Sequence, residues 1–184
     1  MAEHIIDPDF YKELYYKEID IKYLIDEQID DITQVIVVIS GAFYFLAQHL
    51  LSKTGETSFR WIIILSIIFC AGLILRAIYY DAIASINSKI SGFYKGIPTP
   101  LELLQEQKEI YNNIKREENK IEAEKIRGYV ELEFDKKLVL YYSQTADHNQ
   151  KVNDSRLQNT YNAKISMIYS FVAITILAII SIAS

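Results

Sequence analysis

The chain of 184 residues is 51% hydrophobic, carries a formal net charge of −5 and has one cysteine. This length fits one domain or one small membrane assembly. A single thiol excludes an intramolecular disulfide framework, so no oxidising compartment is implied. Most of the hydrophobic residues lie in three runs, at residues 32–51, 61–80 and 164–184.

Each of the three runs has about the length of a membrane-spanning helix, since about 20 helical residues cross a hydrocarbon core of about 30 Å. Three buried helices of a soluble protein are the alternative. The rest of the chain is too polar to form a shell around three helices that are apolar on all sides. We therefore predict an all-α membrane protein with three transmembrane helices and a long-helix cytoplasmic region.

Residues 1–31 are predicted to form a cytoplasmic amphipathic helix. Asp7 and Pro8 are typical of a helix start, with an N-cap acid before a proline at the first helical position. No glycine or proline follows until Gly41, so one helix can continue into the first apolar run. Apolar residues recur among the acids of this segment with the spacing of a helix that packs on another surface.

The segment SKTGETSF between the first two apolar runs is too short for a folded domain. Residues 32–51 and 61–80 are therefore predicted to form a transmembrane hairpin, residues 32–80. By the positive-inside rule, the basic residues of segment 81–163 place that segment and the N-terminus in the cytoplasm. Residues 164–184 are then a C-terminal transmembrane helix.

Segment 81–163 is predicted to be helical after a break at SGFYKGIPTP. Thr99 and Glu102 have the spacing of a capping box, which starts a helix. We expect this helix to end near Gly128, and a long helix to run from Tyr129 into the third span, with a break near residues 147–154 left open.

Three isoleucines of this segment, Ile110, Ile114 and Ile121, form a short coiled-coil-like seam. A contact between subunits and an intramolecular helical hairpin both remain alternatives for it.

No catalytic, cofactor or metal site is predicted, and we expect that the protein is not an enzyme. The histidines His4, His49 and His148 lie far apart, without HxxxH or HExxH partners. The sequence contains no GxxxxGK[ST], GxGxxG or GxSxG motif.

A polar stripe follows one face of the first apolar run. Gln34, Gly41 and Gln48 recur every seven residues, which is two helical turns, and Ser40 flanks them. Polar groups that face lipid are costly, so this stripe faces protein or water. We predict Gln34, Ser40, Gly41 and Gln48 as pore-lining residues, with close helix packing as the alternative.

A second stripe, in the third run, consists of small residues and favours helix packing over a water-filled path. Its members are Ser166, Ser170, Ala173, Ser181 and Ser184.

Arg76 lies at the cytoplasmic edge of the second run. The helix between Arg60 and Arg76 would span only about 22 Å, which is less than the hydrocarbon core. Arg76 is then an anchor that snorkels to the headgroups, a partner of Asp30 or Asp31, or a pore-lining residue. In the last case several copies would form a ring that favours anions, which requires a homo-oligomer.

Tyrosines near basic residues mark a candidate ligand site in the cytoplasmic segment. Aromatic and basic side chains together bind stacked bases and phosphates, so we predict ligand binding by Tyr94, Lys95, Lys136, Lys137 and Tyr141. The nearly balanced charge of the segment argues against a strong nucleic-acid footprint. Packing in a helix seam is the alternative.

Two stretches carry a resemblance to a known group, namely QVIVVISGAFYFLAQHLLSKTGETSFRWIIILSIIFCAGLILRAIYY and PTPLELLQEQKEIYNNIKREENK. This layout resembles the SLATT-type membrane effectors of bacterial anti-phage defence, and with the C-terminal span the Hailong-type membrane channel effector. The resemblance implies an oligomeric inner-membrane ion channel, for example a tetramer, that responds to a nucleotide or oligonucleotide made by a partner nucleotidyltransferase. Its activation would depolarise the membrane and arrest growth, as in abortive infection.

Two other functions remain open. One is a non-conducting membrane scaffold or adaptor whose tyrosine-rich helices dock a cytosolic partner. The other is a holin-like pore whose activity depends on expression alone. A neighbouring nucleotidyltransferase gene would favour the ligand-gated channel.

Overall fold

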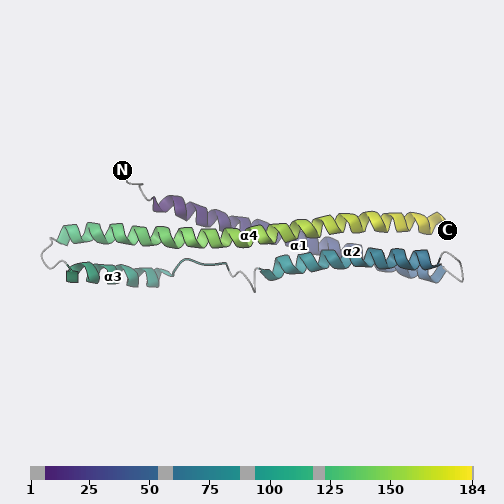
Figure 1. Cartoon of the computed structure of the whole chain (residues 1–184), viewed down its shortest axis with the longest axis horizontal. Helices are drawn as coiled ribbons and strands as arrows, with labels where there is room; N and C mark the ends of the chain where they lie inside the picture. The colour runs from purple at the N-terminus through teal and green to yellow at the C-terminus, as the bar shows by residue number, and fades with distance from the viewer. Residues whose placement is uncertain (1–6, 54–59, 88–93, 118–122, 184) are drawn as a thin grey trace. The chain divides into compact units, whose positions relative to one another are not determined.

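The structure is a computed structural model that describes residues 7–53, 60–87, 94–117 and 123–183. These residues form four α-helices and no strand: α1 (Pro8–Lys53), α2 (Arg60–Asn87), α3 (Pro100–Glu117) and α4 (Ala123–Ala183) (Figure 1). The all-helical prediction is confirmed. Among the described helices, α1, α2 and α4 are long and apolar enough to cross a membrane, which supports membrane association.

The predicted helix starts are confirmed in their local hydrogen bonds. The Asp7 carboxylate accepts a bond from the amide of Asp9 at 3.0 Å, as expected of an N-cap. Ahead of α3, the amide of Glu102 donates to the Thr99 hydroxyl at 3.4 Å, and the amide of Thr99 donates to the Glu102 carboxylate at 2.7 Å. This reciprocal pair is a capping box.

The boundary between α3 and α4 differs from the prediction. Helix α3 ends at Glu117, and Gly128 lies inside α4. One glycine in a helix costs only about 1 kcal/mol relative to alanine, too little to end a helix that packs along its length. Helix α4 also continues through residues 147–154, so the break left open there is absent.

The chain divides into two compact units. Unit 1 comprises Met1–Ile21 and Tyr94–Val152, and unit 2 comprises Lys22–Phe93 and Asn153–Ser184. Helices α1 and α4 contribute residues to both units, α3 belongs to unit 1 and α2 belongs to unit 2.

The core of unit 1 is a contact between α3 and the first part of α4. Ile110 of α3 is buried against Ile126 and Val130 of α4, and Ile114 packs beside them. The seam is therefore filled within one chain, as in the intramolecular hairpin alternative. Ile121 lies outside the described residues.

Among the described residues, two clusters in the core of unit 2 join α1, α2 and α4. In one, Ile32 and Ile36 pack with Ala77 and Ala163, two small residues that let the helices approach closely. The other cluster consists of Leu50, Ile63, Cys70 and Leu177. Each cluster takes side chains from all three helices, so the three apolar runs pack along one another.

Candidate functional site

The glutamine stripe of α1 lies on the surface of unit 2. Gln34 and Gln48 are exposed, whereas Ser40 and Gly41 are half-buried. At about 100° per residue, the two glutamines lie on the face of α1 opposite to its buried residues Ile32, Ile36 and Leu50. The two amides therefore point away from the helices that α1 packs against.

The serine stripe of α4 lies inside unit 2. Ser166 and Ser170 are buried, and their hydroxyls donate to carbonyls one turn earlier in α4, those of Asn162 and Ser166, at 2.8 Å each. Ser181 is also buried, while Ser184 lies outside the described residues. The packing alternative holds for this stripe, because its hydroxyls are satisfied by their own helix.

Arg76 is exposed on α2, with its guanidinium carbon 5.7 Å from the centre of the Tyr80 ring. Among the described residues, no ion pair joins Arg76 to Asp30 or Asp31, so the predicted alternative of a pair within the hairpin is absent. The two other predicted roles of Arg76, a headgroup anchor and a pore-lining residue, both require an exposed guanidinium, and the guanidinium is exposed.

A set of polar contacts that the sequence analysis did not predict joins the three helices of unit 2, beside the ends of the apolar runs at Ile32, Tyr80 and Lys164. We call this set the polar junction. It consists of Asp26, Gln28 and Thr33 of α1, Asp81 and Ala84 of α2, and Arg156 and Lys164 of α4.

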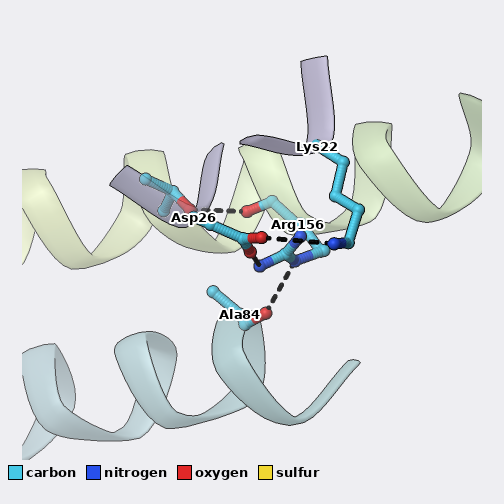
Figure 2. A network of polar contacts seen from close by, with 5 residues as sticks. Lys22, Asp26, Ala84 and Arg156 are labelled. Carbon is cyan, nitrogen blue, oxygen red and sulfur yellow. Dashed lines mark hydrogen bonds and ion pairs between the residues drawn. The ribbon is translucent and has the colours of Figure 1, made fainter. Parts of the chain in front are cut away.

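Arg156 is the centre of the polar junction (Figure 2). Its side chain is 1% exposed, and one guanidinium nitrogen lies 2.5 Å from the Asp26 carboxylate. Its Nε donates to the backbone carbonyl of Ala84 at 3.0 Å. Lys22, one turn before Asp26, lies 3.6 Å from the same carboxylate. One buried arginine of α4 thus binds both α1 and α2.

Two further contacts complete the polar junction. The Lys164 ammonium donates to the side-chain oxygen of Gln28 at 2.9 Å, which joins α4 to α1. The Thr33 hydroxyl lies 2.8 Å from the Asp81 carboxyl, which joins α1 to α2. Each pair of helices in unit 2 therefore shares at least one polar contact.

No local pattern in the sequence points to this junction. Asp26 and Arg156 are separated by 130 positions, and Thr33 and Asp81 by 48. Asp26 stands among several acids and Arg156 in a polar stretch, so each reads as part of a solvated face. The near-complete burial of Arg156 is what distinguishes it.

In unit 1 an open pocket of about 540 Å³ contains part of the predicted ligand site. Lys95 and Tyr141 line it, together with Glu102, Glu106 and Thr145. The backbone of Lys95 is held by Asn149, which is fully buried and whose side chain accepts from the Lys95 amide at 2.9 Å and donates to its carbonyl at 3.2 Å.

Two of the predicted ligand residues, Lys137 and Tyr141, meet at Glu106. The Tyr141 hydroxyl donates to the Glu106 carboxylate, and this bond raises the pKa of Tyr141. The Lys137 ammonium lies 3.9 Å from the same carboxylate. Lys136 pairs instead with the exposed Glu133 at 2.7 Å, and Tyr94 is half-buried outside the lining.

The charges of this pocket do not favour a bare phosphate. Glu106 offsets the charge of Lys137, and Glu102 adds a second carboxylate. Carboxylates accept hydrogen bonds, so the pocket favours ligand groups that donate them, such as N–H groups. Among the described residues no three His, Cys, Asp or Glu side chains gather closely enough to hold a metal ion.

Comparison with protein-family models, with curated proteins and with solved structures gives no match.

Proposed function

We propose that this chain is a subunit of an oligomeric ion channel of the bacterial inner membrane, an effector of anti-phage defence that depolarises the membrane and arrests growth. Its cytoplasmic helices receive a nucleotide-type signal. The defence role, the nucleotide and its partner nucleotidyltransferase rest on the resemblance to SLATT-type and Hailong-type effectors, and the ion path rests on the surface of unit 2.

One observation carries the ion path: two exposed amides on the outer face of an apolar run. Gln34 and Gln48 lie opposite the packing face of α1, so the helices of one copy leave them at the surface. Lipid tails offer an amide no hydrogen bond, which costs several kcal/mol per unsatisfied group. A ring of copies with this face turned inward would give both amides water.

The signal would act on unit 1, where the predicted residues Lys137 and Tyr141 contact Glu106 and Lys95 lines the same pocket. The hydrogen-bond acceptors there match the N–H groups of a nucleobase better than they match a phosphate. Helices α1 and α4 supply residues to both units, so a change in unit 1 would reach unit 2 through the chain itself.

The proposal is tested by recording purified protein in planar bilayers with nucleotide extract added on one side. We expect discrete currents that the extract changes. Gln34→Leu together with Gln48→Leu should alter conductance at least several-fold. Val35→Leu is the matched control, because Val35 is also exposed in the same run but is already apolar.

Silence in all conditions, with insertion verified, would reject the channel and favour the scaffold that docks a cytosolic partner. Exposed Leu101, Leu104 and Tyr111 on α3 would be the first surface to examine in that case. Currents that the glutamine variants leave unchanged would place the ion path elsewhere.

A further inference from the structure

Asp81 is a buried carboxyl group that the proposed channel does not use. It directly follows the second apolar run and is 9% exposed. Its Oδ2 lies 2.8 Å from the Thr33 hydroxyl on α1. Its Oδ1 is buried and has no hydrogen-bond partner among the described residues.

The hydroxyl of Thr33 makes two contacts but has one proton. Its oxygen lies 2.8 Å from Asp81 Oδ2 and 3.0 Å from the backbone carbonyl oxygen of Ile29. A carbonyl and an ionised carboxylate only accept hydrogen bonds, so one hydroxyl cannot give both a full bond. If Asp81 Oδ2 carries a proton, it donates to Thr33, and Thr33 donates to Ile29. Both distances are then hydrogen bonds at once.

The surroundings of the second oxygen of Asp81, Oδ1, also favour a protonated, neutral carboxyl group. A buried ionised carboxylate needs a cation or several donors, whereas a neutral carboxyl leaves only an unsatisfied carbonyl oxygen. Within the described residues, Asp81 Oδ1 has no cation and no hydrogen-bond donor beside it.

The charged groups that face Asp81 do not neutralise it. On α1 the negative charge of Asp30 opposes a second negative charge on Asp81. On α4 the cations of the polar junction are held elsewhere, Arg156 by Asp26 and Lys164 by Gln28. On α2 itself, Arg76 is exposed beside Tyr80.

We propose that Asp81 is a proton-binding site that keeps α1 and α2 together: the carboxyl is neutral in the packed unit, and loss of its proton opens the contact with Thr33. The ligand is a proton, taken up from the side on which the polar junction lies. The site does not depend on ion conduction, so it goes beyond the proposed function.

Infrared spectroscopy of the protein in lipid vesicles tests this directly, because a protonated carboxylic acid has a C=O stretch that carboxylates lack. At about pH 6, where an ordinary aspartate is ionised, we expect this band in the native chain. Asp81→Asn should remove it, and Asp30→Asn should keep it. Thr33→Ala should shift its frequency, since the hydrogen bond is lost while the acid remains.

A second measurement follows the packing. Thermal stability of the native chain should fall as pH rises through the titration of Asp81, because the folded state holds a proton that the unfolded state has released. Asp81→Asn should remove that slope. The absence of the carboxylic band at about pH 6, or a band that Asp81→Asn leaves unchanged, would overturn the proposal.

Discussion

Exposed ion pairs within α4 in unit 1 and the buried Arg156 of unit 2 use charge in different ways. In unit 1 the ion pairs Arg127–Glu131 and Lys136–Glu133 join neighbouring turns of α4 and are exposed. In unit 2 Arg156 of α4 is 1% exposed and binds groups on two other helices. An exposed ion pair within a helix stabilises that helix by a few tenths of a kcal/mol. Removing the partner of a buried arginine destabilises the fold much more, because an uncompensated charge stays buried.

The exposed pairs bear on whether a helix forms, whereas the buried arginine bears on how the helices are arranged. The exposed pairs of unit 1 support α4 wherever that helix lies. The hydrogen bonds of the polar junction form in one arrangement of α1, α2 and α4. Apolar contacts are not directional, whereas Arg156 must meet Asp26 on α1 and the Ala84 carbonyl on α2. Changes in the polar junction should therefore have the larger effects.

The largest effect is expected from Asp26→Ala. It leaves the buried guanidinium of Arg156 without its carboxylate, which should lower the free energy of unfolding by about 3 kcal/mol. This is the lower end of the range for a broken buried pair, because Asp26 itself is 41% exposed. Adding Arg156→Met should recover most of the loss, since no buried charge remains.

The matched control for that change is Asp147→Ala, which breaks the exposed pair with Lys151 on α4. It should alter the free energy of unfolding by less than about 0.5 kcal/mol. Both series are measured by denaturant unfolding in the same detergent. Equal losses for Asp26→Ala and Asp147→Ala would contradict the distinction between the two units.

An intermediate effect is expected from Asn149→Ala in unit 1. The buried amide of Asn149 holds both backbone groups of Lys95, so its loss should cost about 1–2 kcal/mol and speed hydrogen exchange at the Lys95 amide. Asn159→Ala is the control, because within the described residues the Asn159 side chain donates to a carbonyl of its own helix, that of Ser155. Equal changes in Lys95 amide exchange in both variants would show that the Asn149 side chain does not specifically hold the Lys95 backbone.

The smallest effect concerns the start of α3 and depends on pH. Bonds from the amide and the hydroxyl of Thr99 lower the pKa of Glu102, because both stabilise the ionised carboxylate. The stabilisation is therefore present above the ordinary glutamate pKa of about 4.3 and is lost as pH falls through that region. Amide protection in the first turn of α3, corrected for the intrinsic pH dependence of exchange, should fall on acidification.

Glu102→Gln is the control for the pH effect, because glutamine keeps an acceptor oxygen but does not titrate. Its amide exchange should change less over the same range, after correction for the intrinsic pH dependence of exchange. An identical acid response in both chains would assign the effect to another group.

Local features of the fold were predictable from the sequence. The caps at Asp7 and Thr99 depend on residues two or three positions apart. The apolar runs that make α1, α2 and α4 long and apolar enough to cross a membrane are continuous. The predicted helix end near Gly128 was wrong. The small intrinsic penalty of one glycine is outweighed there by the packing of Ile126 and Val130 on α3.

Of the candidate site, the sequence determined the glutamine stripe, because helical periodicity alone places Gln34, Gly41 and Gln48 on one face. Which face of α1 is buried was decided by packing on α2 and α4. The polar junction was decided entirely there, since Asp26, Ala84 and Arg156 come together only when three helices have met. Spacing along the chain determines which residues share a helix face, whereas contacts between distant residues depend on how those faces pack.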